Sequence, residues 1–272
     1  MPLITISQDF GSEGYAIAKQ VAESLELDLY DDERLKEEAL KEGIRPDYLK
    51  GLEEKAPGFF DRLMGRKPDI YLDILKSVVY HISRSGDGIV VGHGSQMLLK
   101  DFNCALHIRI YESIQKRAET LAQQENLAYE AAEKVIRKRD EEYKGFFKYA
   151  FQMDPNNPEL YDLFLNTGKI SAETAARYIA DLARSDDIKA CSLAVLESMD
   201  RMSLERKIHA ALSEHGIFPK MISVEVSGTG TACIYGVTSS ESEKDRIVDV
   251  VTNMKEIDRI ENNIVVAKGM YI

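Results

Sequence analysis

The start of the chain combines three features that restrict which folds it can adopt. A short β-rich run at residues 3–7 is followed by a loop containing Gly11 and Gly14, and then by apolar residues at helical spacing from Ile17. A strand, a glycine-bearing loop and a helix, in this order, open many nucleotide-binding α/β domains. We therefore expect an α/β domain with a loop placed to bind phosphate.

Strand and helix patterns alternate from the N-terminus to about residue 188. The apolar run at residues 89–91 has no polar alternation, which is typical of a central parallel strand buried on both faces. Other strands are expected at residues 27–30, 105–110 and 160–165, and helices at residues 70–83, 113–125, 128–143 and from 171 onward. This alternation predicts a doubly wound parallel sheet. Residues 43–69, rich in glycine and proline, are expected to be irregular.

The pattern changes after residue 197. An amphipathic helix around residues 204–212 precedes an alternating strand, a turn at residues 227–230 and a second strand, and a further helix and strand follow. This αββαβ order predicts a small α+β domain with two helices on a three-stranded sheet. We therefore expect two domains, residues 1–188 and residues 197–272.

Composition excludes several classes of protein. The net charge of −11 argues against a nucleic-acid binder, and no apolar run reaches the ~18 residues of a membrane span. The N-terminal residues show no secretory signal pattern, so a cytoplasmic protein is expected. Cys104, Cys191 and Cys233 lie far apart and form no metal or redox motif, so we expect buried thiols.

The loop after the first strand is the candidate phosphate site. Backbone N–H groups at the start of a helix attract anions, and the candidate cofactor-binding residues are Gly11, Ser12 and Gly14. A complete P-loop motif also needs a lysine that reaches the phosphates and a hydroxyl for Mg²⁺. Gly14 stands where the lysine would be, and Ala16 stands where the hydroxyl would be. The loop by itself leaves nucleotide binding and a structural turn open.

Several segments resemble the cytidylate-kinase-like family, which has the P-loop fold of nucleoside monophosphate kinases. They are Ile-Ser-Gln-Asp-Phe-Gly-Ser-Glu-Gly at 6–14, Leu-Tyr-Asp-Asp at 29–32, Val-Val-Gly-His-Gly at 90–94, Gln-Lys-Arg at 115–117, the helix at 133–140 and Leu-Tyr-Asp-Leu-Phe-Leu-Asn-Thr at 160–167. The resemblance implies phosphoryl transfer from ATP to CMP or dCMP, with ATP and Mg²⁺ as cofactors.

The resemblance also implies roles for individual residues. Arg137 and Arg139 would clamp phosphates and Asp140 would orient one of them, so these three are the candidate catalytic residues. The candidate substrate-binding residues are Asp31, Asp32, His93 and Arg117. The basic run at residues 137–139 is equally typical of a solvated helix face. The two acids at residues 31–32 are equally typical of the first turn of a helix. No dedicated metal ligands are expected.

The chain departs from the family pattern where positive charge is needed. Gln8 replaces an early arginine, Glu13 replaces a loop glycine, His93 stands within the Gly-Arg-Gly position, and Tyr143 stands at the arginine of the lid. Phosphoryl transfer depends on positive charge around the moving group. Three hypotheses follow: an active nucleotide kinase, a catalytically degenerate fold that senses a nucleotide or other phosphorylated ligand, and a scaffold.

Residues 200–267 resemble the BON domain. The similarity covers the helix at 204–212, the strand–turn–strand segment at 224–237, the helix at 239–251 and the strand at 257–266. This resemblance implies a binding module without catalysis. A protein partner and self-association are its candidate roles.

Overall fold

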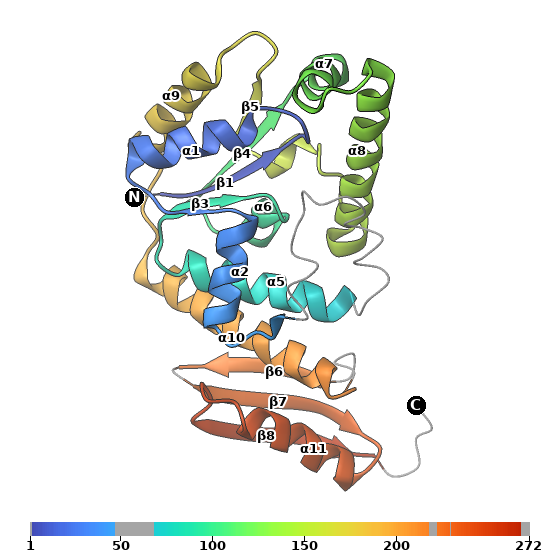
Figure 1. Ribbon diagram of the computed structural model, residues 1–272. Helices are drawn as coiled ribbons and strands as arrows, with labels where there is room; N and C mark the ends of the chain where they lie inside the picture. Colours follow the sequence, from blue (N-terminus) through green and yellow to red (C-terminus); the bar gives the residue numbers. More distant parts are fainter. Residues whose placement is uncertain (1, 47–67, 218–221, 229, 268–272) are drawn as a thin grey trace. The chain divides into compact units, whose positions relative to one another are not determined.

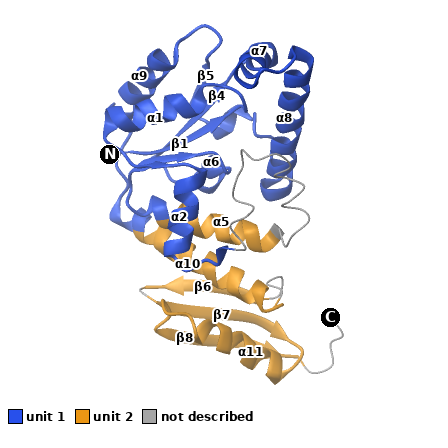
Figure 2. Cartoon of the chain, viewed as in Figure 1, with its two compact units in different colours: residues 1–66, 82–196 blue, residues 67–81, 197–272 orange. Residues whose placement is uncertain are grey.

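The computed structural model describes all residues except 1, 47–67, 218–221, 229 and 268–272 (Figure 1). Most of the irregular region expected at 43–69, and part of the expected turn at 227–230, lie outside the described residues. The chain forms two compact units: unit 1 comprises Met1–Arg66 and Ile82–Leu196, and unit 2 comprises Lys67–His81 and Glu197–Ile272 (Figure 2). Unit 2 thus includes an early segment of the chain as well as its C-terminal part.

Unit 1 is built on a five-stranded sheet in the order β2-β3-β1-β4-β5. Its strands are β1 (Leu3–Gln8), β2 (Leu29–Tyr30), β3 (Gly88–Val91), β4 (Ala105–Tyr111) and β5 (Leu163–Asn166). Every neighbouring pair is parallel, which confirms the predicted parallel α/β sheet. The continuous apolar run in β3 is fully buried, as a strand covered on both faces requires.

Helices alternate with these strands along the chain. They are α1 (Gly14–Leu25), α2 (Asp32–Lys41), α6 (Ser95–Leu98), α7 (Ile114–Glu125), α8 (Tyr129–Phe151) and α9 (Ala172–Ala183). Ile17 of α1 and Ile179 of α9 pack with Ile6 and Ile108 in the main core, on one face of the sheet (Figure 1). The Ser171 side chain caps α9, as its sequence predicts.

Side chains of β4 alternate between two environments. Leu106, Ile108 and Ile110 join the core under α1 and α9. Because successive side chains of a strand point to opposite faces, Arg109 and Tyr111 belong to the other face of the sheet. This face of β4 supplies polar groups to the site described below.

Several elements differ in length from the sequence prediction, among them α8, β5 and α10. Helix α8 continues to Phe151, beyond the expected end at residue 143, because Phe146 and Phe147 are fully buried and hold its last turns in place. The strand expected from residue 160 begins only at Leu163, since Pro158–Leu160 forms a 3₁₀ turn. The side chain of Asn157 caps that turn.

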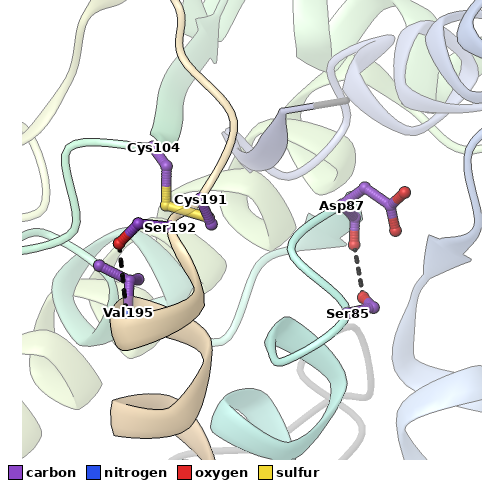
Figure 3. Close-up of a disulfide and its surroundings, with 6 residues drawn as sticks. All are labelled: Ser85, Asp87, Cys104, Cys191, Ser192 and Val195. Carbon is purple, nitrogen blue, oxygen red and sulfur yellow. Dashed lines mark hydrogen bonds between the residues drawn. A yellow bond between two sulfur atoms is a disulfide. The ribbon is translucent and has the colours of Figure 1, made fainter.

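The expectation that all cysteines are thiols is wrong. Cys104 and Cys191 form a disulfide with a Cα–Cα distance of 4.9 Å, across 87 residues of sequence (Figure 3). No local sequence pattern predicts this pairing, because only the fold brings the residue before β4 next to residue 191. Cys233 is a buried thiol, as expected. Stable disulfides are uncommon in the reducing cytosol, so this bond argues against the predicted cytoplasmic location.

Unit 2 contains the predicted αββαβ arrangement. Its elements are α10 (Leu193–Glu214, of which residues from 197 belong to this unit), β6 (Ile222–Ser227), β7 (Thr231–Thr238), α11 (Glu241–Thr252) and β8 (Arg259–Val266). The sheet order is β6-β7-β8, with the first pair antiparallel and the second parallel. Ile208, Ile234 and Ile247 are fully buried in its core. Buried and exposed residues alternate along β6, as expected of a strand with one covered face.

Unit 2 also includes most of helix α5 (Pro68–Ser83). Ser203 of α10 donates to the carbonyl of Ser77, and Arg206 lies 3.4 Å from the carboxylate of Asp73. A polar seam therefore links α5 to α10. No helix in the described part of the chain is long and apolar enough to cross a membrane.

Candidate functional site

The loop between β1 and α1 makes a tight turn against β4. The amide of Asp9 donates to the carbonyl of Ile110, and the Asp9 carbonyl accepts from both the amide and the hydroxyl of Ser12. Gly11 has a φ of +82°, and a Cβ there would lie 2.9 Å from Ile136 of α8. Only glycine satisfies both the backbone angle and the close approach of α8.

The first turn of α1 leaves its amides open to an anion. The N-cap residue, Glu13, makes no side-chain capping bond, and the amides of Gly11 and Glu13 have no acceptor among the described residues. A Cβ at Gly14 would approach within 2.4 Å of the Gln8 side chain, so glycine is needed at this position for steric reasons. Such a helix start, with unsatisfied N–H groups, favours negative charge.

A cavity of ≈190 Å³, which we call the loop cavity, lies against this loop. It gathers four segments that meet at the carboxyl ends of the strands, where α/β proteins bind ligands. The lining residues are Gln8, Asp9, Phe10, Gly11, Ser12 and Tyr15, Asp31 and Asp32, Val91 and Gly92, and Arg139, Asp140 and Tyr143. Most of the predicted site residues therefore share one cavity. Gly14, His93, Arg117 and Arg137 are not part of its lining.

Both acids at the start of α2 are held in place by neighbours. Asp31 is the N-cap of α2, accepting from two backbone amides, and it also accepts a hydrogen bond of 2.8 Å from Tyr15. That hydrogen bond to Asp31 is the main reason why the pKa of Tyr15 is raised. Asp32 lies 2.7 Å from Nε2 of His93, which is fully buried. His93 therefore holds Asp32 in position without itself lining the loop cavity.

The two candidate catalytic arginines lie in different environments. Arg139 lines the loop cavity, where its guanidinium stands 5.0 Å from the centre of the Phe10 ring and 3.3 Å from Glu142. The side chain of Arg137 is 57% exposed and pairs with Glu133 one turn earlier on α8. The structure therefore brings Arg139 to the cavity and leaves Arg137 on a solvated helix face.

Arg117 supports the loop from beneath. Its buried guanidinium donates to both carboxylate oxygens of Asp140 at 2.9 Å, and also to the carbonyls of Phe10 and Glu112. These contacts join the loop, β4 and α8. The geometry gives Arg117 a positioning role, whereas the sequence suggested that it binds substrate.

Glu13, whose charge could have blocked the loop, is absent from the lining of the loop cavity. It lines a separate cavity of ≈540 Å³ together with Glu112 and Lys116. Burial raises the pKa of Glu112 above its ordinary value, and the charge of Glu13 adds to this shift. The loop cavity is therefore not filled by the glutamate that departs from the family pattern.

A buried arginine on β4, Arg109, was not identified from the sequence. It donates to Asp9 at 2.5 Å and to Asn156 at 3.1 Å, and lies under the ring of Tyr143. Burial opposes its charge, but Tyr143 and Asp9 favour it, so its pKa is raised. One signal was available: a cation within the apolar strand Leu-His-Ile-Arg-Ile needs a buried partner.

Arg109 belongs to a second cavity, of ≈390 Å³, which we call the β4–β5 pocket. The lining residues, from the ends of β1, β4 and β5 and from α8, are Asp9, Arg109, Tyr111, Arg117, Asp140, Tyr143, Lys144, Pro155, Asn156 and Phe164. Asp9, Asp140 and Tyr143 line both cavities. The two cavities are therefore neighbours, separated by these three side chains.

Comparisons with known proteins agree with this geometry. The model of the cytidylate kinase-like family matches residues 3–169, and that of the BON domain matches residues 200–268. A cytidylate kinase of Pyrobaculum islandicum (strain DSM 4184 / JCM 9189 / GEO3) is 25% identical over 182 residues, covering 66% of this chain and 92% of that protein.

A solved structure shares the fold of unit 1. It is an uncharacterized protein from Eubacterium ventriosum ATCC 27560, with a TM-score of 0.51 and 21% identity, and the match covers 67% of this chain and 97% of that one. A family match over more than half of the chain, on a parallel sheet with a glycine loop at its carboxyl edge, settles the relationship. The chain belongs to the cytidylate kinase-like family and carries a BON domain in its C-terminal part.

Proposed function

We propose that the chain transfers a phosphoryl group from ATP to a nucleoside monophosphate of the CMP or dCMP class. One observation carries the proposal: Gly11, whose amide has no acceptor among the described residues, and Arg139 line the same cavity. Backbone amides at a helix start hold phosphates, and a fixed guanidinium stabilises the charge that develops on the transferred group.

The other residues of the cavity would place the two substrates. Asp31 and Asp32 line the same cavity as Arg139 of α8, and their carboxylates would accept hydrogen bonds from a nucleoside. Asp140 lines the cavity but is held by Arg117, so it would fix the distance between loop and α8. The roles of the loop and of Arg139 are thus electrostatic, and those of Asp140 and His93 are positional.

The residues present suit a Mg²⁺ ion that arrives with the nucleotide. Among the described residues no cluster of three acidic, histidine or cysteine side chains could hold a metal alone. Mg²⁺ in phosphoryl-transfer enzymes is commonly held by one or two carboxylates together with substrate phosphates, and Asp31 and Asp32 line the cavity. The ion would neutralise phosphate charge when bound.

A catalytically degenerate nucleotide sensor is the second candidate function. The specific observation is the state of the cations: Arg109 and Arg117 are paired with Asp9 and Asp140, and Tyr143 occupies the lid position. Less positive charge is then available for the transition state than phosphoryl transfer normally uses. The same cavity could still bind a nucleotide without turning it over.

Substitution of Arg139 tests the proposal against a matched control on the same helix. We expect Arg139→Met to lower kcat/KM for CMP phosphorylation by about 100-fold, because a preorganised charge is lost at the transferred group. Arg137→Met, which removes an exposed guanidinium outside the cavity, should leave the rate within about twofold. ADP release with ATP–Mg²⁺ and each nucleoside monophosphate gives the rates, and calorimetry gives the affinities.

The outcomes separate the two functions. Turnover that falls in Arg139→Met alone supports the kinase. Binding of ATP without turnover, weakened by the same substitution, supports the sensor. If wild type neither binds nor turns over any nucleotide, both are wrong.

The BON domain is proposed to bind a partner protein or a second copy of the chain. Its support is the family match over residues 200–268. If Arg137→Met and Arg139→Met still self-associate, this role of the BON domain is independent of ligand binding in the loop cavity.

A further inference from the structure

The β4–β5 pocket has features that phosphoryl transfer in the loop cavity does not use. Its volume of ≈390 Å³ lies within the range of roughly 300–1,000 Å³ typical of ligand pockets. Tyr111 marks the carboxyl end of β4, and Phe164 lies on β5 at the edge of the sheet. Ligands of α/β proteins bind beyond the carboxyl ends of parallel strands. Position and size therefore both suit a small molecule.

The wall of this pocket carries an excess of positive charge. Three cations, Arg109, Arg117 and Lys144, face two carboxylates, those of Asp9 and Asp140. Each arginine is bonded to one carboxylate. Lys144 has no carboxylate within ion-pair distance in the described part of the chain, and its side chain is exposed. Its ammonium group is therefore available to an anionic ligand.

Arg109 contributes an unsatisfied hydrogen-bond donor to the lining of the pocket. Its side chain is almost fully buried, and its Nε has no hydrogen-bond acceptor among the described residues. Buried donors are rarely left without an acceptor unless the site has a function.

Two aromatic rings line the pocket together with the charged groups. Tyr111 is 37% exposed and Phe164 is 38% exposed, and their ring centres are 6.2 Å apart. Exposed aromatic rings beside cationic groups are the arrangement on which nucleobases stack, with little preference between bases. A ligand that has both a planar ring and a phosphate would contact both sides of the pocket.

We propose that the β4–β5 pocket binds a nucleoside monophosphate as a regulatory ligand, with its base on Tyr111 and Phe164 and its phosphate on Lys144. The pocket communicates with the loop through Asp9, whose carboxylate receives Arg109 and whose carbonyl receives Ser12. A ligand that shifts Arg109 would therefore alter the phosphate loop. The site is separate from the loop cavity and does not require the chain to be an active kinase.

A single fluorophore can report this pocket alone, because the chain contains no tryptophan. Phe164→Trp in the full chain places an indole at the pocket, and a stacked base should quench its emission. The probes are CMP, cytidine, which lacks the phosphate, and ribose 5-phosphate, which lacks the base. Each is titrated into Phe164→Trp alone and into the same chain with Lys144→Met, Lys138→Met or Arg139→Met.

We expect saturable quenching by CMP and a roughly tenfold higher half-saturation concentration with Lys144→Met, equivalent to the loss of one charged hydrogen bond. Cytidine should bind Phe164→Trp about as weakly as CMP binds the variant with Lys144→Met. Ribose 5-phosphate should not quench the tryptophan emission. Lys138→Met, an exposed lysine outside the pocket, and Arg139→Met should leave the CMP curve unchanged.

Two results would overturn the proposal. One is the absence of saturable quenching by CMP, or quenching that Lys144→Met does not weaken. The other is a loss with Arg139→Met as large as that with Lys144→Met, which would place the ligand in the loop cavity. Failure of phosphoryl transfer would affect neither result, so the two proposals can fail independently.

Discussion

The guanidinium of Arg117 ties three parts of unit 1 together. It makes four hydrogen bonds, to Glu112, to Phe10 and to both oxygens of Asp140. Burial opposes its charge, but the hydrogen bond to Asp140 and the neighbouring carboxylates outweigh this, so its pKa is raised. With four of its five N–H donors taken, Arg117 has little capacity left for a substrate, and we infer that it holds the loop in shape.

Loss of Arg117 should therefore destabilise unit 1. We expect Arg117→Met to lower its free energy of unfolding by about 3 kcal/mol, because Asp140 would keep a partly buried charge without its partner. Arg117→Lys, which keeps the charge but not the bidentate geometry, should lower the free energy of unfolding by less. Hydrogen exchange of the β1 and β4 amides measures both changes. Equal protection in Arg117→Met and wild type would contradict the positioning role.

Sequence reasoning reached the residues of the loop and of α2 but not Arg109. Gly11, Ser12, Asp31 and Asp32 follow predicted strands, so their common position at the sheet edge could be anticipated from topology. The partner of Arg109, Asp9, lies 100 residues away, and its pairing depends on strand register. Periodicity within one segment contains no information about such a register.

At the scale of elements, the strands were the easiest to predict and the helix ends the hardest. The buried runs of β1 and β3 are apolar throughout, because both faces of a parallel sheet are covered. The last turns of α8 depend on Phe146 and Phe147 finding a buried environment, which tertiary packing decides. The sequence predicts an amphipathic helix only around residues 204–212, whereas α10 begins at Leu193, because its buried residues follow no single stripe.

The disulfide links two elements, the start of β4 and the segment before α10. Its opening should lower the stability of unit 1 by about 2–5 kcal/mol, as expected when a long loop in the unfolded chain is released. Cys104→Ser and wild type treated with a thiol reductant should show the same lowered midpoint in thermal unfolding. Cys233→Ser, which alters a thiol of unit 2, is the control. A midpoint that reductant does not change would show that the bond adds no stability.

At the scale of the molecule, the family limits and the compact units differ. The BON match begins at residue 200, whereas unit 2 also includes Lys67–His81 from helix α5. The sequence could not show this, because α5 lies among the elements of the other unit along the chain. Two of its contacts with α10 are polar, Ser77 with Ser203 and Asp73 with Arg206, and neither pairing can be read from a local sequence pattern.

Helix α5 should therefore stabilise the C-terminal part of unit 2 when the two segments are joined in one fragment. We expect residues 197–272 to fold alone, since their core is complete, and to unfold at a higher temperature when residues 67–81 are joined to them by a flexible linker. The gain should be about 1–2 kcal/mol from the seam of hydrogen bonds. The linked fragment with Ser203→Ala and Arg206→Met is the matched control. Identical midpoints for the linked and unlinked fragments would show that α5 contributes nothing.

A single backbone cut between Cys104 and Cys191 leaves the chain in one covalent piece. The segment between the two cysteines, which lie 87 positions apart, contains α7, α8 and β5, and it supplies most of the wall of the β4–β5 pocket and the α8 side of the loop cavity. A protease that nicks this span would produce fragments that migrate together on a gel until a thiol separates them. Digestion experiments on this protein will therefore under-count cleavage near the cavities unless each sample is also run reduced.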